Sequence, residues 1–148
     1  MASQTETTTA KRAGIFEHLD TVIVRVRHLD KARAWYEEKL ELKPAFVHSD
    51  IVVFDTGGAT SLTIWRMGEG EKLAPRHFQG CFSIFYPADL DAAYALLKDR
   101  GVEVGPFDSD GDTRWFSFHD PEGNRLGCAC TRGMAANVSF RAQRGICL

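Results

Sequence analysis

Alternating apolar and polar residues predict four short strands in each half of the chain. Between the first and second strand of each half, apolar residues recur every three to four positions, which is the period of an amphipathic helix. The predicted strands span residues 18–26, 45–48, 51–55 and 61–66, then 81–86, 102–107, 113–119 and 125–130. The predicted helices span 29–42 and 90–101. Each half therefore follows the order strand, helix, strand, strand, strand.

The two predicted helices carry the clearest trace of an internal duplication. Residues 29–36 (LDKARAWY) and 90–97 (LDAAYALL) match at four places with one constant offset. The identical pairs are Leu29 and Leu90, Asp30 and Asp91, Ala32 and Ala93, and Ala34 and Ala95. Such self-similarity indicates two copies of one structural unit, here residues 15–67 and 80–131.

Three segments fall outside the two units. Residues 1–14 are rich in threonine and poor in apolar residues, so we expect them to be disordered. Residues 68–79 combine glycine, proline and charge without a period, which is typical of a linker. Residues 132–148 show no strong period, and we expect either a flexible tail or an arm that contacts a partner.

One helix can cover only one face of a four-stranded sheet, so each unit leaves its other face open. Two such units side by side would form a curved mixed sheet with a concave cavity on the side away from the helices. The pattern therefore predicts an α+β fold, with two tandem βαβββ units in a single domain over residues 15–131.

Composition and charge exclude some classes of partner. The chain has 148 residues, of which 44% are hydrophobic, and a net charge of −2. Its lysines and arginines are scattered, so we expect binding neither to nucleic acid nor to a membrane surface. No apolar run approaches the roughly 20 residues that cross a bilayer, and the start lacks the apolar segment of a signal peptide. We therefore expect a cytoplasmic protein.

The stretch at 116–130 (FSFHDPEGNRLGCAC) is typical of a strand, a tight turn and a second strand. Pro121 presets φ near −65°, and Gly123 or Asn124 can take a positive φ. Together with VRHLDKA at 26–32 and the aromatic helix that follows, this turn resembles the vicinal oxygen chelate superfamily. That superfamily includes glyoxalase I, bleomycin-resistance proteins, fosfomycin-resistance enzymes and extradiol dioxygenases. The resemblance covers about residues 16–131 and implies a cup, a homodimer and, in the enzymes, a divalent metal.

The positions that the resemblance assigns to metal ligands carry none of the usual His, Glu or Gln residues. They are Thr21 and Thr63 in the first unit and Phe82 and Gly127 in the second. Two hydroxyls, a phenyl ring and a glycine are not a ligand set for a transition metal. We therefore predict neither a metal nor another cofactor.

The five histidines do not restore a metal site. His18 is expected on the opposite face of its strand, His28 at the rim, His48 in a turn and His77 in the linker. His119, at a strand end, is the one that we retain as an acid or base at the cavity edge.

Strand alternation selects the side chains that would line the cup. The expected ligand-binding residues are Thr21, Ile23, Arg25, Thr63, Trp65, Phe82, Ile84, Tyr86, Trp115 and His119. Arg25 is informative, because burying an unpaired guanidinium costs several kcal/mol. Its partner is either an anionic or carbonyl group of a ligand or a carboxylate of the protein, or else the side chain reaches the rim. The aromatic rings would stack on a planar ligand or form part of the core.

Several functional hypotheses fit these residues. The first is a metal-independent protein of the bleomycin-resistance type, which binds or sequesters an aromatic or anionic small molecule in a dimeric cup. The second is a metal-dependent lyase, isomerase or dioxygenase that holds its metal at other positions. The third is a metal-free enzyme with Arg25 as electrostatic stabiliser and Tyr86 or His119 as proton donor. A scaffold role would instead require a cup filled by Trp65, Phe82 and Tyr86.

Overall fold

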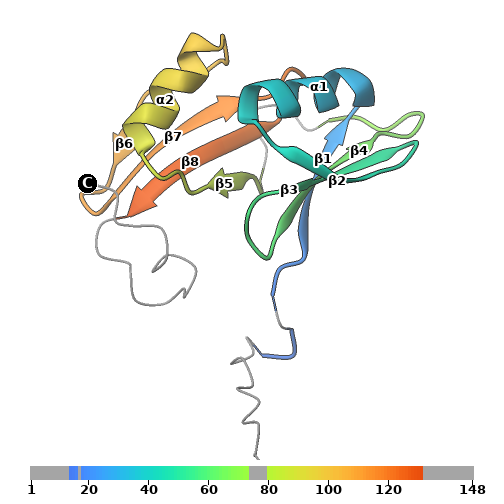
Figure 1. Ribbon diagram of the computed structural model, residues 1–148, viewed down its shortest axis with the longest axis horizontal. Coiled ribbons are helices and arrows are strands. Elements are labelled where there is room, and N and C mark those ends of the chain that lie inside the picture. The colour runs from blue at the N-terminus through green and yellow to red at the C-terminus, as the bar shows by residue number, and fades with distance from the viewer. Residues whose placement is uncertain (1–13, 17, 74–79, 132–148) are drawn as a thin grey trace, which may run out of the picture.

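The computed structural model describes residues 14–16, 18–73 and 80–131 (Figure 1). The first unit contains β1 (Thr21–Val26), α1 (Leu29–Leu40), β2 (Lys43–Val47), β3 (Ile51–Asp55) and β4 (Ser61–Arg66). The second unit contains β5 (Ser83–Phe85), α2 (Leu90–Asp99), β6 (Asp108–Ser109), β7 (Thr113–His119) and β8 (Arg125–Thr131). The predicted α+β fold of two βαβββ units is therefore confirmed. The expectations for 1–13, for residues 74–79 of the linker and for 132–148 lie outside the described residues.

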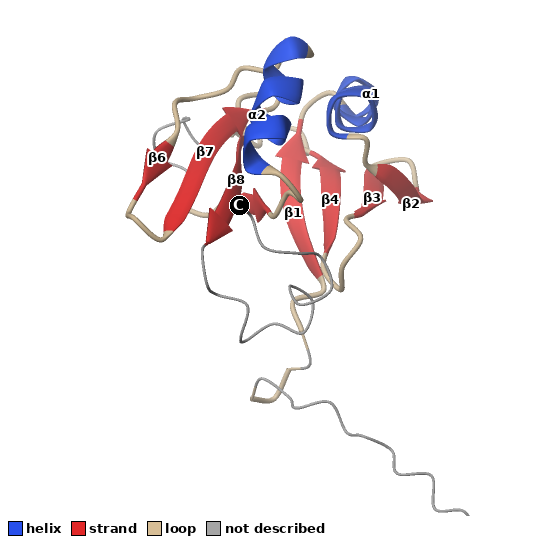
Figure 2. Ribbon diagram, turned by 60° about the vertical axis from the view of Figure 1, so that its left-hand side comes forward, coloured by secondary structure: helices blue, strands red, loops and turns tan. Residues whose placement is uncertain are grey.

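Each unit forms its own four-stranded mixed sheet. The strand orders are β1-β4-β3-β2 and β5-β8-β7-β6, so the two sheets have the same topology. In both, the first strand runs parallel to the last, and the other neighbours are antiparallel. Both helices lie on the same side of the sheets (Figure 2). We call the opposite side, which the helices leave open, the concave face. Within the part of the chain that the structure describes, no helix is long and apolar enough to cross a membrane.

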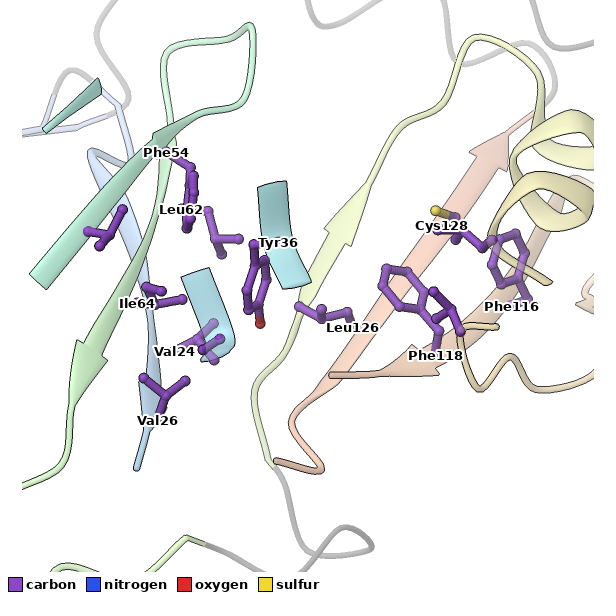
Figure 3. Packing of buried hydrophobic residues seen from close by; sticks show 14 of the residues in the cluster. Val24, Val26, Tyr36, Phe54, Leu62, Ile64, Phe116, Phe118, Leu126 and Cys128 are labelled. Atoms are coloured by element: carbon purple, nitrogen blue, oxygen red, sulfur yellow. The ribbon is translucent and has the colours of Figure 1, made fainter. Parts of the chain in front are cut away.

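The hydrophobic core lies between the helices and the sheets. In β1, Val24 and Val26 are 9% and 0% exposed, whereas Ile23 is 48% exposed. The predicted alternation of this strand is thus confirmed. Tyr36 of α1 lies between Leu62 of the first sheet and Leu126 of the second (Figure 3). One continuous core therefore joins the two units.

The predicted strand at 102–107 is wrong in its position. A single bridge joins Val104 to Phe118, and the two-residue strand β6 follows only at 108–109. Pro106 has no N–H to donate to a ladder, and the Gly105 N–H donates to the Ser117 carbonyl at 2.7 Å. The other predicted elements agree with the structure to within three residues at each end.

The two helices begin in different ways. The Asp89 carboxylate accepts the N–H of Ala92 at 2.9 Å and caps α2, as its residue type predicts. His28 makes no side-chain hydrogen bond at the start of α1. The Glu122 carboxylate lies there instead and accepts the N–H groups of Arg27 and His28 at 2.8 and 2.9 Å. A negative charge at a helix N-terminus is stabilising, so a residue of the second unit takes the capping role in the first.

The turn that contains Glu122 also joins the units at two other points. Asp120 is 4% exposed, and its carboxylate accepts the Tyr36 hydroxyl at 3.0 Å. The Asn124 side-chain amide donates to the carbonyl of Arg25 at 3.0 Å. Gly123, with φ +87°, takes the positive φ that the turn was predicted to need. These bonds hold β1 against the second unit and so position the site described below.

Candidate ligand-binding site

The concave face of the first sheet exposes mainly apolar side chains, and one arginine, Arg25, lies next to them. Ile23 and Trp65 are 48% and 39% exposed there. The parallel register of β1 and β4 pairs Arg25 with Trp65. Thr63 is buried, and its hydroxyl oxygen lies 2.7 Å from that of Thr21. The two hydroxyls therefore bond to each other beside the exposed apolar groups.

A cavity of about 210 Å³ lies on the concave face of the second sheet; we call it the second-sheet cavity. Phe82, Ile84 and Trp115 supply apolar parts of its lining, and Gly127 lies at its floor. A Cβ added at Gly127 would lie 3.6 Å from Cγ1 of Ile84 and 3.8 Å from Cε2 of Phe82. Two apolar side chains thus cover the position at which the related enzymes are expected to hold a metal ligand.

The four positions that the resemblance assigns to metal ligands do not fit a metal. Thr21 and Thr63 form a hydroxyl pair, while Phe82 and Gly127 offer no side-chain donor atom. Among residues 14–16, 18–73 and 80–131, no three His, Cys, Asp or Glu side chains are grouped so that they could hold a metal ion. These positions can contact organic groups but are not a transition-metal ligand set.

Arg25 is paired within the protein. Its Nη2 donates to Oε2 of Glu71 at 2.5 Å, and its guanidinium carbon lies 4.6 Å from the centroid of the Trp65 ring. The internal salt bridge, one of the alternatives left open by the sequence, is therefore present. The N–H of Gly68 also donates to the Glu71 carboxylate. This backbone hydrogen bond, followed by the bond from Arg25, lowers the pKa of Glu71.

A larger cavity of about 380 Å³ lies at the seam between the sheets; we call it the seam cavity. Both Arg25 and Arg125 line it. The Arg125 guanidinium carbon lies 4.0 Å from the centroid of the Phe82 ring, and its Nη2 donates to the Ser117 hydroxyl at 3.0 Å. Because Phe82 and Arg125 also line the second-sheet cavity, the two cavities adjoin.

Arg125 was missing from the residues expected from the sequence. It lies on β8 two residues before Gly127. Since alternate residues of a strand point to one face, the argument that placed Gly127 on the concave face also places Arg125 there. The alternation of β8 was therefore a sufficient signal for Arg125.

Six of the ten expected residues line neither cavity. Four of them lie on β1 and β4 of the first sheet, namely Thr21, Ile23, Thr63 and Trp65, and the other two are Tyr86 and His119. Tyr86 follows β5 and packs against the hydrophobic core. That strand has only three residues, so its alternation need not extend to Tyr86. His119 ends β7 half-buried and lines neither cavity. The proton donors of the metal-free enzyme hypothesis thus do not line the seam cavity with Arg25. The other described histidines, all exposed, are His18, His28 and His48; His77 lies outside the described residues.

The thiols at the site differ in accessibility. Cys128 lines the second-sheet cavity, and burial raises its pKa to about 12. A thiol with so high a pKa stays protonated near neutral pH and is a poor nucleophile. Cys81 lines the seam cavity and is a free, exposed cysteine. Of these two thiols, Cys81 is the one open to solvent.

Solved structures of known proteins share this architecture. TnmS3, an antibiotic binding protein from Streptomyces sp. CB03234, is 26% identical over 77% of this chain and 95% of its own, with a TM-score of 0.63. A glyoxalase/bleomycin resistance protein/dioxygenase from Alicyclobacillus acidocaldarius is 20% identical over 78% of this chain and 92% of its own, with a TM-score of 0.63. Lactoylglutathione lyase from Agrobacterium tumefaciens is 17% identical over 76% and 92%, with a TM-score of 0.62. The last two similarities, at such low identity, show the fold alone.

Sequence comparison identifies the family. No relative was found among curated protein sequences. The family model of the Glyoxalase/Bleomycin resistance protein/Dioxygenase superfamily, however, matches residues 18–127. This range includes nearly all of both βαβββ units. The chain therefore belongs to the Glyoxalase/Bleomycin resistance protein/Dioxygenase superfamily.

Proposed function

We propose that this protein binds or sequesters an aromatic or anionic small molecule on its concave face and does so without a metal. One observation carries the proposal, namely what occupies the expected metal positions. Thr21 is hydrogen-bonded to Thr63, and Phe82 lies over Gly127. The floor of the site is therefore built to contact organic groups rather than to ligate an ion.

Exposed apolar side chains would supply most of the binding free energy. Ile23, Trp65 and Ile84 are 48%, 39% and 58% exposed in the single chain. Burial of apolar surface contributes about 25 cal/mol per Å², and aromatic rings add a preference for planar partners that stack on them. Arg25 and Arg125 lie beside this surface and favour anionic or carbonyl groups on the ligand.

The similarity to TnmS3 supports the same proposal. That protein is described as antibiotic binding, and the similarity extends over 95% of its length. A protein with this fold can thus serve to bind an antibiotic. We propose binding of the same general kind for this chain, with the ligand selected by its own concave face.

We also propose that two copies of the chain form a homodimer. Phe46 of β2 is 56% exposed, and the strand register places it on the same face as Ile23 and Trp65, which are exposed as well. Clustered exposed apolar groups commonly mark interaction surfaces. Size-exclusion chromatography with light scattering is expected to give twice the chain mass of 16.5 kDa. A monomer at all accessible concentrations would contradict the homodimer but not the binding proposal.

Titration with planar aromatic compounds, followed by tryptophan fluorescence, tests the binding proposal. Trp65→Ala and Phe82→Ala are each expected to weaken binding about two- to twelvefold, because ring stacking is worth about 0.5–1.5 kcal/mol. Leu96→Ala is the matched control, since this side chain is 44% exposed on α2, on the helix side of the sheets. Failure of every compound in a broad aromatic and anionic panel to bind would overturn the proposal.

Metal dependence is tested separately. Metal analysis of the purified protein should find no stoichiometric transition metal, and Ni²⁺, Zn²⁺, Fe²⁺ and Mn²⁺ should leave the melting temperature nearly unchanged. A stoichiometric metal, or a large and saturable thermal shift, would favour the metal-dependent enzyme and overturn the metal-independent proposal.

A further inference from the structure

We infer that the ligand is a planar aromatic carboxylate and that Glu71 occupies the place of the ligand's carboxylate while the site is empty. The inference rests on the proposed function, which it narrows to one ligand class and extends by one regulatory contact. Its basis is the contact between Arg25 and Glu71 at the seam cavity, which both residues line.

The Arg25 guanidinium is held in a position where it can bind a carboxylate. Trp65 lies 4.6 Å from the guanidinium carbon, so the guanidinium is held against an aromatic ring. One of its nitrogens, Nη2, binds a carboxylate oxygen of Glu71 at 2.5 Å. Guanidinium groups bind carboxylates best through two parallel N–H bonds. A ligand carboxylate that accepts two N–H bonds from the guanidinium would therefore bind Arg25 more strongly than Glu71 does, because Glu71 contacts only Nη2.

Glu71 is held in a way that allows its release. The N–H of Glu71 donates to the carbonyl of Gly68 at 3.2 Å, and Gly70 has φ +81°, as in a reverse turn. The turn therefore positions the carboxylate without burying it, and the side chain is 48% exposed. Exposed ion pairs contribute little net stability. Exchange of the Arg25–Glu71 ion pair for an ion pair between Arg25 and a ligand carboxylate would thus cost the protein little.

The charges around the seam cavity favour an anion. Of the described residues that line it, Arg25, Lys72 and Arg125 are cationic and Glu71 is anionic. Displacement of Glu71 would leave three cationic side chains facing the ligand. The cavity volume of about 380 Å³ lies within the range of about 300–1,000 Å³ that is usual for small-molecule sites.

The aromatic part of the ligand is indicated by the adjoining second-sheet cavity. Phe82 and Arg125 line both cavities, and Trp115 and Ile84 line the second. A ligand whose carboxylate binds Arg25 can therefore extend its ring system over Phe82 toward this apolar surface. Stacking on a ring and on a guanidinium plane both favour a flat, conjugated body.

Two isosteric probes, 2-naphthoate and 2-naphthamide, test the inference by isothermal titration calorimetry on the full chain. Glu71→Gln removes the competing charge and is expected to tighten naphthoate binding about two- to fivefold, the effect of removing one exposed ion pair. Naphthamide binding should not change. Glu69→Gln, an exposed acid of the same turn, is the control for net charge and should affect neither probe. Arg25→Ala should remove the preference for naphthoate over naphthamide.

The outcomes separate this inference from the proposed function. Equal binding of both probes by the unaltered protein, or naphthoate binding that is unchanged or weaker in Glu71→Gln, would overturn the role of Glu71 and leave aromatic binding in place. An equal gain in Glu69→Gln would assign the effect to net charge and would also overturn it. If neither probe bound to any variant, both the inference and its premise of an aromatic-binding site would be contradicted.

Discussion

The two units have the same topology, yet they differ in how far they depend on each other. α2 is capped by Asp89, a residue of its own unit, whereas the start of α1 is bound by Glu122 of the second unit. Tyr36 in α1 and Leu97 in α2 occupy equivalent positions of the duplication. Leu97 needs only apolar neighbours, but the Tyr36 hydroxyl needs a polar partner and finds it in Asp120. The first unit therefore relies on polar groups that the second supplies.

The concave face shows a second difference between the units. The expected ligand positions carry two hydroxyls in the first unit and a ring over a glycine in the second. The turn at 120–124 keeps both its shape and its contacts to the first unit. The turn that holds the units together is thus present, while the four expected ligand positions carry no transition-metal ligand set.

Asp120→Ala should produce the largest change, because it removes the polar centre of the contact between the units. The carboxylate accepts the Tyr36 hydroxyl and the backbone N–H groups of Glu122 and Asn124 at 2.9 and 2.8 Å. Several bonds to a charged acceptor, at about 1.5–3 kcal/mol each, lead us to expect a loss of at least about 3 kcal/mol in the free energy of unfolding. Urea denaturation measures this loss.

Tyr36→Phe is the matched variant, since it removes only one of these bonds. We expect a loss of about 1–2 kcal/mol. If both variants lost the same amount, the Tyr36 hydroxyl would account for the whole effect, and the role assigned to Asp120 in the turn would be wrong.

An effect of alkaline pH should come next in size. Burial, and then the Asp120 carboxylate, raise the pKa of Tyr36 well above its ordinary value of 10.0. The folded protein thus favours the neutral phenol, and the corresponding stability is present below about pH 10 and lost as the pH rises toward the folded pKa. For one group the slope reaches about 1.4 kcal/mol per pH unit. Unfolding curves measured from pH 9 to 11 should show this loss in the unaltered protein and a smaller loss in Tyr36→Phe. Parallel losses in both proteins would contradict the assignment.

Removal of the two helix caps should have the smallest effects and compares the units directly. Asp89→Ala and Glu122→Ala are each expected to cost about 1 kcal/mol. Amide hydrogen exchange should locate the change in α2 for Asp89→Ala and in α1 for Glu122→Ala. If exchange in α1 were unaffected by Glu122→Ala, the first unit would not depend on the second for this helix.

The sequence predicted the secondary-structure elements and the faces of the strands better than it predicted which side chains contact each other. Periodicity located both helices and the βαβββ repeat, and the family resemblance grouped Thr21 with Thr63 and Phe82 with Gly127, which lie together in the structure. It also left the partner of Arg25 open between a ligand and a carboxylate of the protein. The alternation of the short strand β5 did not account for the position of Tyr86. The strand predicted at 102–107 is wrong because Gly105 and Pro106 interrupt the ladder after the single bridge at Val104.

What the sequence determined by itself is therefore local, because periodicity depends only on neighbouring residues and their burial on one face. It established the duplicated α+β units, the turn at 120–124 and the residue types on the concave face. The tertiary structure alone decided which distant groups meet. Glu71 reaches Arg25 across 46 residues, and Glu122 reaches Arg27 across 95. The Glu122 contact depends on how the two units dock and the Glu71 contact on the turn at 68–71 that follows β4, and no local pattern encodes either.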